Sequence, residues 1–320
     1  MALHPHIQAA LKAAEGVPPH YAVPLEQARA QAKLGYPTPN PPVPVAQVRD
    51  TVIPGPAGPM AVRVYTPVGT APHPVIVFFH GSGFVLLDLD SHDDICRRLC
   101  AGAASVVVSV DYRLAPEHKF PAAADDCLAA TRWAAAHAGA LGGDAGRLAV
   151  AGDSAGGCLA AVTAIRIRDE GGPPLSAQVL LYPVTDYPSV APDSYTTYGA
   201  GYGLTDAGMR WFWHQYLADP SAASHCHASP LRVGTPAGLP SSYVMVAEFD
   251  VLRDEGEAFA RRLGEHGITT ALRRSEGMNH GFLKYTGVIE QADAAMADAC
   301  AWLRRVLHTR PQPMESATPC

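Results

Sequence analysis

The chain carries, at three well-separated points, the residue types that nucleophilic catalysis needs. Ser154 lies in Gly152-Asp153-Ser154-Ala155-Gly156, which follows the GxSxG pattern. A serine hydroxyl is a weak nucleophile until a base removes its proton, and a third group must hold that base in one tautomer. A suitably placed histidine and aspartate would therefore allow attack on a carbonyl carbon and formation of an acyl-enzyme.

The residues around Ser154 predict the local structure that such a serine requires. An apolar run over 147–151 leads into the glycine-containing turn, and an apolar segment of helical length follows over 155–170. In a strand, turn and helix of this kind the serine lies at a strained corner, and glycines flank it because larger side chains would collide with neighbouring strands. The first N–H groups of the helix have no partner within it, so they suit a developing oxyanion.

The carboxylate and the histidine are expected at the ends of other strands. Asp250 directly follows the apolar run 241–249, and His280 lies in the loop after the last predicted strand. In an open α/β sheet the site lies beyond the carboxyl ends of the strands, and the order Ser, Asp, His is that of an α/β-hydrolase. We therefore assign Ser154, Asp250 and His280 as catalytic, with Glu248 as the alternative partner of His280 and Asp153 as a residue that orients a loop.

A glycine-rich turn, His80-Gly81-Ser82-Gly83-Phe84, leaves the apolar strand that begins at Val75. Backbone N–H groups in such a turn can face the serine and supply donors where negative charge develops in a tetrahedral intermediate. Loss of one donor of this kind typically costs about 3 to 4 kcal/mol. The turn is therefore expected to matter as much as the three catalytic side chains.

Alternating apolar strands and helix-length segments predict a sheet with helices on both faces. Near-continuous apolar strands are buried on both sides, which indicates a mostly parallel sheet. An antiparallel hairpin over 45–53 and 60–65 is expected at one edge. The parallel strands are predicted over 75–79, 105–110, 147–151, 177–181, 241–247 and 269–274, and the helices over 7–14, 25–34, 91–101, 121–138, 155–170, 204–217, 254–266 and 286–307.

Interruptions of this alternation predict the domain organisation. The proline-dense stretch 36–44 excludes a helix and indicates a linker. Between 186 and 230 the alternation lapses into a Tyr-rich and Gly-rich stretch with one aromatic helix, which is typical of a lid-like insertion. We expect N-terminal cap helices and a linker over 1–44, the core over 45–185 and 231–308, a cap insertion over 186–230 and a disordered tail over 309–320.

Composition excludes several classes of function. With a formal charge of −6 and a pI near 6.1, the chain lacks the basic surface that nucleic acid requires. Seven irregularly spaced cysteines in 320 residues indicate reduced thiols rather than a disulfide framework. No stretch has the pattern of a signal peptide or the roughly 20 apolar residues of a membrane span. We expect a cytoplasmic protein with no membrane span and no nucleic-acid partner.

Several motifs, in order along most of the chain, resemble those of the hormone-sensitive-lipase family of bacterial esterases. They are residues 80–84, 111–118, 120–123, 152–157, 181–183, 250–256 and 280–282. The resemblance implies an α/β-hydrolase with a helical cap that hydrolyses carboxylic esters without a cofactor. It also implies that the N–H groups of Ser82, Gly83 and Ala155 form the oxyanion hole.

One position departs from the family pattern, because this chain has Ser82 where the family usually has glycine. A non-glycine residue at positive φ costs on the order of 1 kcal/mol or more. Either φ is negative there or the loop is strained, and we expect Ser82 to keep its donor role in both cases.

The expected function is a serine carboxylesterase for short- to medium-chain esters, because an aromatic cap over a bounded pocket suits small apolar acyl chains. An amidase or arylacetamide deacetylase stays open, since both reactions pass through the same tetrahedral geometry. A third alternative is a small-molecule receptor without catalytic activity. The presence of His280, the candidate base, argues against it. We expect the substrate to contact Phe84, Tyr187, Tyr198, Tyr202, Trp211, Phe212, Leu252 and Phe282.

Other polar clusters have structural interpretations. Arg113 and Glu117 are expected to form buried ion pairs that support the site. In His225-Cys226-His227 adjacent side chains of an extended segment would point in opposite directions, so we predict no metal site. Cys96 and Cys100 should pack on one face of a helix. A homodimer stays open.

Overall fold

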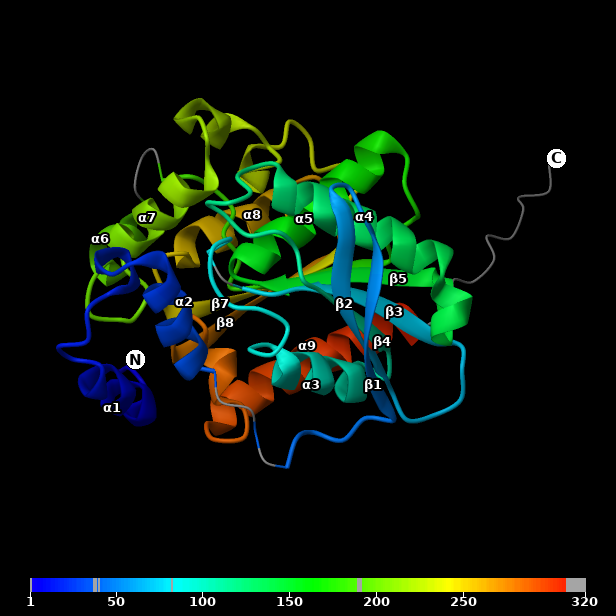
Figure 1. The fold of residues 1–320 in the computed structure, drawn as a ribbon, viewed down its shortest axis with the longest axis horizontal. Coiled ribbons are helices and arrows are strands. Elements are labelled where there is room, and N and C mark those ends of the chain that lie inside the picture. The colour runs from blue at the N-terminus through cyan, green and yellow to red at the C-terminus, as the bar shows by residue number, and fades with distance from the viewer. Residues whose placement is uncertain (1, 37–38, 40, 82, 189–191, 309–320) are drawn as a thin grey trace.

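A sheet of eight strands, in the order β1-β2-β4-β3-β5-β6-β7-β8, organises the structure. The computed structural model describes residues 2–36, 39, 41–81, 83–188 and 192–308. Ser82 and the tail 309–320 therefore lie outside the described residues, and the predictions for them stay predictions. Figure 1 shows the sheet crossing the middle of the molecule with helices above and below it.

The strands confirm the predicted mixture of a parallel sheet and an edge hairpin. Strands β1 (Gln47–Gly55) and β2 (Gly58–Thr66) pair antiparallel, and β2 pairs antiparallel with β4. From β4 to β8 every neighbouring pair is parallel. These strands are β3 (His73–Phe79), β4 (Val106–Val110), β5 (Gly143–Asp153), β6 (Ala177–Leu181), β7 (Ser241–Phe249) and β8 (Thr270–Asn279).

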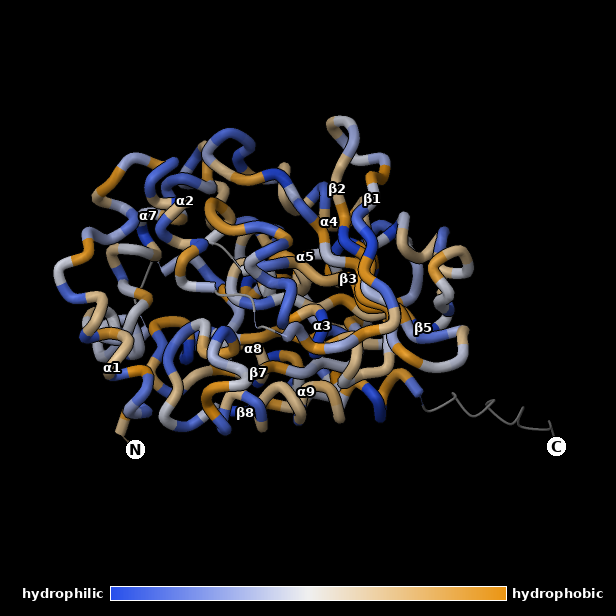
Figure 2. The backbone as a smooth tube through the Cα atoms, turned by 60° about the horizontal axis from the view of Figure 1, so that its bottom comes forward, coloured by the Kyte–Doolittle hydropathy of each residue, from blue (hydrophilic) through white to orange (hydrophobic). Residues whose placement is uncertain are grey.

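Both faces of the central strands are buried, which explains their continuous apolar sequence. Successive side chains of a strand point to opposite faces of a sheet. In β3, Val75, Val77 and Phe79 belong to one core cluster, whereas Ile76 and Phe78 belong to the other. Figure 2 shows hydrophobic stretches along β3 and its neighbours, whereas the outer loops and helices alternate between hydrophobic and hydrophilic stretches.

Two helical layers cover the sheet. Helices α3 (Asp93–Ala103) and α9 (Glu290–His308) lie on one face, and α4 (Ala122–Ala136), α5 (Ala155–Glu170) and α8 (Arg253–Glu265) lie on the other (Figure 1). Cys96 and Cys100 of α3 are both buried, which confirms the prediction that they pack on one helix face.

The C-terminal part differs from the prediction in two element bounds. Strand β8 continues to Asn279 rather than ending at residue 274, because its pairing with β7 resumes after an irregularity and places Asn279 opposite Phe249. The last helix begins at Glu290 rather than at 286, because a 3₁₀ turn, η5 (Phe282–Tyr285), and Gly287 at φ 79° precede it. Both differences leave His280 in a short connection between β8 and η5.

The N-terminal helices and the predicted insertion lie together, beyond the carboxyl ends of the parallel strands (Figure 1). The first group is α1 (Pro5–Ala13), η1 (His20–Ala22) and α2 (Leu25–Leu34), which confirms both predicted N-terminal helices. The second is α6 (Asp193–Tyr198), α7 (Asp206–Tyr216), η3 (Pro220–Ser224) and η4 (Pro230–Arg232). The sequence predicted α7 but not α6, which is too short for a helical repeat to be recognised. None of the helices in the described part of the chain combines the length and apolar character that crossing a membrane requires.

Candidate active site

Ser154 lies at a strained turn between β5 and α5, as the sequence predicted. Its backbone has φ 55° and ψ −121°, a region that non-glycine residues rarely adopt. A Cβ on Gly156 would overlap the carbonyl group of Phe79 in the neighbouring strand, and one on Gly152 would overlap the carbonyl of Gly156. Only glycine therefore fits at both positions, and the close packing fixes the serine at the strand end.

Ser154, His280 and Asp250 form a continuous chain of polar contacts. The Ser154 Oγ lies 2.8 Å from Nε2 of His280, and Nδ1 of His280 lies 2.7 Å from Oδ2 of Asp250. Asp250 is 2% exposed, and its second oxygen accepts a hydrogen bond from the Leu252 N–H at 3.0 Å. In this arrangement the imidazole can accept the serine proton while the carboxylate fixes its tautomer.

Glu248, the alternative partner of His280, has a different contact. Its Oε2 accepts a hydrogen bond from the Gly277 N–H at 2.7 Å, which links β7 to β8. The pairing of β7 with β8 is irregular between Ala247 and Phe249, so the alternation of side chains does not continue regularly through Glu248. The structure therefore brings Asp250, and not Glu248, to the ring of His280.

Asp153 anchors the glycine-rich turn, which confirms its predicted role in orienting a loop. Its Oδ1 accepts a hydrogen bond from the Gly81 N–H at 2.7 Å, and Nε2 of His92 lies 3.2 Å from the same oxygen. Burial favours the protonated acid, but His92 and the Gly81 N–H outweigh it and lower the pKa of Asp153. The ionised carboxylate thus fixes the turn through the Gly81 N–H. A second contact fixes the start of the turn, because the Tyr112 hydroxyl donates to the His80 carbonyl at 2.7 Å.

Replacing Asp153 by alanine should reduce kcat by about tenfold to a hundredfold, because the turn loses the acceptor that fixes the Gly81 amide. Steady-state kinetics with one ester will measure the change in kcat, and a thermal melt will show whether the variant is folded. Asp144→Ala is the matched control, since Asp144 lies in the same strand but at the surface, paired with Arg147. Equal kinetic losses in the two variants would contradict a role for Asp153 in positioning the turn.

Two of the predicted oxyanion donors lie within the described residues. Ala155 is the first residue of α5, so its N–H has no acceptor within the helix. Gly83 has φ 59°, and a Cβ on it would overlap the ring of Phe212. Glycine is therefore required at position 83 both by the backbone conformation and by the approach of α7.

The predicted substrate-contacting residues fall into two groups. Four lie on or against α7: Phe84 stacks on Tyr216 with ring centroids 3.8 Å apart, Tyr187 lies edge-on to Trp213, and Trp211 and Phe212 contact each other and His20. The other group lies near the Asp250 loop and in the core. Tyr198 accepts a hydrogen bond from Arg253, Tyr202 stacks on Phe249, and Leu252 and Phe282 are buried. Aromatic side chains of residues 187–216 thus pack against the core residues Phe84 and Phe249.

The predicted ion pairs exist, but only one of them is buried. Arg113 binds Asp126 through two nitrogens at 2.8 and 2.9 Å, and Asp126 is 2% exposed. Glu117 instead pairs with Arg29 of α2, and its side chain is 49% exposed, so the prediction of a buried pair was wrong there. Arg29 also donates to the carbonyls of Val85 and Ala115, because the N-terminal segment lies across the glycine-rich turn.

His225-Cys226-His227 does not have the extended conformation that was predicted for it. The segment is a turn rather than an extended strand, with the N–H of Ala228 bonded to the carbonyl of His225. One ligand atom of each of the three side chains lies within 4.8 Å of the others as a result. Burial raises the pKa of the Cys226 thiol, which disfavours the thiolate that binds metals.

Glu255 is a buried acid that no sequence motif indicated. Its Oε1 accepts hydrogen bonds from the N–H groups of Thr185 and Asp186, at 2.7 and 3.2 Å, and it thereby fixes the turn after β6. Burial raises the pKa of Glu255 to about 8. No local pattern distinguishes such a residue from the surface acids of α8, because its burial depends on contacts with a distant strand.

This raised pKa predicts a pH-dependent stability. The folded chain keeps a proton on Glu255 that the unfolded chain releases, so stability is present at low pH and is lost as the pH rises toward about 8. Glu255→Gln keeps the shape without the titration. We expect the Tm of this variant, relative to wild type, to rise by several degrees between about pH 5 and pH 9, given about 2–4 °C per kcal/mol. Glu265→Gln is the control at an exposed position, and a constant difference for Glu255→Gln would contradict the expectation.

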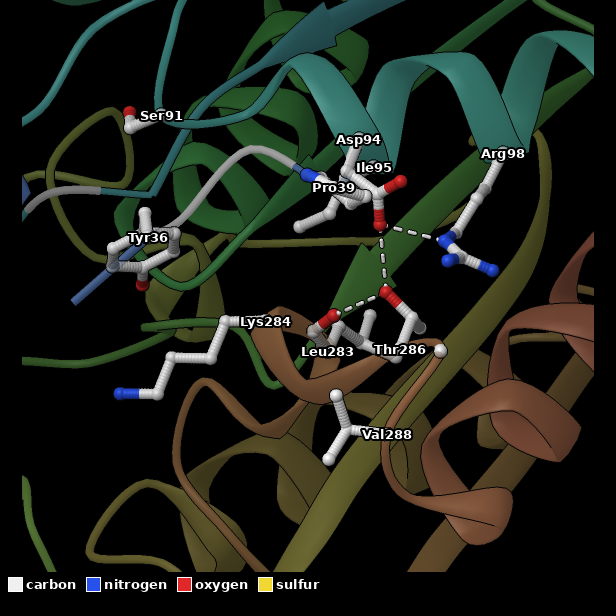
Figure 3. A pocket seen from close by; sticks show the side chains of 11 residues that line it. Tyr36, Pro39, Ser91, Asp94, Ile95, Arg98, Leu283, Lys284, Thr286 and Val288 are labelled. Atoms are coloured by element: carbon white, nitrogen blue, oxygen red, sulfur yellow. Dashed lines mark hydrogen bonds and ion pairs between the residues drawn. The ribbon is translucent and has the colours of Figure 1, made fainter. Parts of the chain in front are cut away.

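The segment that follows His280 is fastened to α3 beside a cavity of about 190 Å³. Figure 3 shows the chain of contacts: Thr286 donates to Asp94 at 2.8 Å and Asp94 accepts from Arg98 at 2.6 Å. The ammonium of Lys284 points away from this chain and lies 5.7 Å from the centre of the Tyr36 ring. Ser154, Asp250 and His280 do not line this cavity, so it is separate from the relay.

The fold and the three-residue relay define a class, the α/β-hydrolases. A family model described as the alpha/beta hydrolase fold matches residues 76–284. Within that class, the chain belongs to the hormone-sensitive-lipase family of esterases, as its motifs indicated.

Named relatives and solved structures agree with this membership. The chain is 43% identical to Esterase LipI of Mycobacterium tuberculosis over 83% of its own length and 84% of the relative's. It is 41% identical to Carboxylesterase NlhH of the same species over 77% and 78% of the two lengths. A thermostable esterase from Pseudomonas putida superposes with a TM-score of 0.91 at 38% identity, covering 97% of this chain and 99% of that one. A hyperthermophilic esterase from Pyrobaculum calidifontis gives 0.89 at 39% identity, covering 95% and 99%.

Proposed function

We propose that this chain is a serine carboxylesterase that works through an acyl-enzyme intermediate. The observation that carries the proposal is the relay from Ser154 through His280 to the buried Asp250, with contacts of 2.8 and 2.7 Å. The names of its relatives, esterases and carboxylesterases, favour an ester as the substrate. The helix N-terminus behind Ser154 favours the negative charge that forms during attack.

The reaction has two halves. His280 takes the Ser154 proton as Oγ attacks the ester carbonyl carbon, and Asp250 stabilises the imidazolium that forms. The N–H groups of Ser82, Gly83 and Ala155 hold the oxyanion, and the alcohol leaves with the proton from His280. His280 then removes a proton from water, and the water oxygen attacks the carbonyl carbon of the acyl-enzyme. When the bond to Ser154 Oγ breaks, His280 returns the proton to that oxygen and the acid is released.

The packing of α7 favours short to medium acyl chains. Phe212 lies directly against Gly83 of the turn proposed to hold the oxyanion. Trp213 and Tyr216 of α7 belong to the same buried cluster as Phe84, the residue after Gly83. A site bounded in this way limits the length of the acyl chain that it can enclose.

A series of p-nitrophenyl esters tests both the reaction and the chain-length preference. We expect kcat/KM to be highest for acyl chains of about two to eight carbons and to fall beyond them, because each further methylene must fit a bounded pocket. A value that keeps rising beyond about ten carbons would contradict the bounded pocket. Matched p-nitroanilides tell an esterase from an amidase, and we expect the ester of each pair to be the better substrate.

A further inference from the structure

The ring of Phe212 lies directly on the glycine-rich turn next to the nucleophile. A Cβ built on Gly83 would overlap Cγ, Cδ1 and Cε1 of Phe212, so α7 contacts the backbone of the turn itself. Phe212 is 6% exposed. Its position therefore decides how much space is left beside residue 83, where the proposed reaction places the ester carbonyl.

His20, which precedes α2, contacts the same ring. The imidazole stacks on Phe212 with centroids 4.8 Å apart and planes inclined by 28°, and it lies 5.2 Å from the ring of Trp211. Figures 1 and 2 both show the N-terminal segment beside α7. Phe212 thus contacts the turn and the N-terminal segment at the same time.

The contact of His20 with α7 is made by its ring and not by a hydrogen bond. Its Nε2 is buried and has no hydrogen-bond partner among the residues that the structure describes. The charged residues in the first turns of α7, Asp206 and Arg210, pair with each other at 3.0 Å. Burial lowers the pKa of His20, which keeps the imidazole neutral. A neutral aromatic ring is therefore the property that matters at this position.

We propose that His20 is a positioning residue that holds Phe212 against the turn and so sets the width of the acyl pocket. The inference rests on the proposed ester hydrolysis and adds a determinant of its specificity. The residue acts from the N-terminal segment, outside the core that carries the three catalytic side chains. Loss of the His20 ring leaves one side of Phe212 without support, and the ring can then move away from Gly83.

The test compares p-nitrophenyl hexanoate with p-nitrophenyl acetate in wild type and variants. The ratio of the two kcat/KM values cancels losses that affect both substrates equally, such as partial unfolding. We expect His20→Ala to raise this ratio at least about fivefold, because more space becomes available beside the carbonyl. His20→Phe should restore the wild-type ratio, since a phenyl ring makes the same stack without an unpaired nitrogen. His6→Ala, an exposed histidine whose ring contacts Tyr285, is the matched control.

A double-mutant cycle shows whether His20 acts through Phe212. We expect Phe212→Ala to raise the ratio by itself, and His20→Ala in that background to add nothing, because the ring to be held is gone. His20→Leu, which keeps apolar volume without an aromatic ring, replaces His20→Ala in every comparison if the alanine variant does not fold.

Three outcomes would overturn the inference: a ratio in His20→Ala equal to that of the His6→Ala control, a failure of His20→Phe to restore the ratio, or additive effects in the double mutant. A wild-type protein that hydrolyses neither ester would instead refute the proposed function. The two failures are therefore distinguishable in the same experiment.

Discussion

Ser154→Ala should lower kcat for ester hydrolysis by about 10⁴-fold or more, because no other group of the site can form the acyl-enzyme. The fold should remain intact, since the Ser154 hydroxyl contacts only His280 among the hydrogen bonds of the described residues. What activity remains would come from the oxyanion donors and from binding alone.

The measurement is a burst experiment with p-nitrophenyl acetate, accompanied by a thermal melt. Wild type should release one equivalent of nitrophenolate rapidly before the steady state if deacylation is slower, and the variant should release none. Ser224→Ala is the control, because its hydroxyl donates to the Ser221 carbonyl at the surface. Retention of more than about a hundredth of the wild-type kcat in Ser154→Ala would contradict covalent catalysis at this serine.

Asp250→Asn should lower kcat by about 10⁴-fold, the second largest effect that we expect. Asp250 Oδ2 accepts from Nδ1 of His280 at 2.7 Å, and an asparagine amide would present its own N–H there and favour the wrong tautomer. The imidazolium that forms during attack would also lose its only counter-charge within the relay. Shape and burial hardly change, so the loss would reflect charge and tautomer rather than packing.

Glu248→Gln is the decisive comparison for this assignment. Its carboxylate binds the Gly277 N–H at 2.7 Å, and an amide oxygen can accept the same hydrogen bond. We expect kcat to change by less than about threefold, because no part of the proton relay is altered. The reverse pattern, with a small loss at Asp250 and a collapse at Glu248, would assign the orienting role to Glu248.

Much of the fold could be predicted because its central strands are buried on both faces and its helices have regular apolar repeats. The strained turn at Ser154 was predictable for a local reason: only glycine fits at 152 and 156. Asp250 and His280 were found because the carboxyl ends of parallel strands meet at one edge of the sheet. Asp153 was predicted only to orient a loop, and the structure identifies that loop through the hydrogen bond from the Gly81 N–H.

The remainder depended on contacts between distant segments, which leave no periodic signal. In the sequence Glu255 cannot be told from the other acids of α8, and only its contacts with the turn after β6 show that it is buried. No sequence pattern distinguishes His20 from other loop residues, and only the structure shows that α7 packs on its ring. Glu117 was expected to be buried, but its partner is Arg29, on a helix that was predicted to belong to a separate N-terminal unit. The turn at 225–227 was missed because an extended segment was assumed.

The measurement that tests the central claim most directly is covalent labelling with a fluorophosphonate, read by mass spectrometry of the intact protein and of its peptides. Such reagents phosphonylate a serine only where a base activates it and an oxyanion hole receives the phosphonyl oxygen. The relay predicts a single adduct, on Ser154, formed in parallel with the loss of esterase activity, absent in Ser154→Ala and strongly slowed in Asp250→Asn. An unlabelled protein, or an adduct on any other residue, would contradict it.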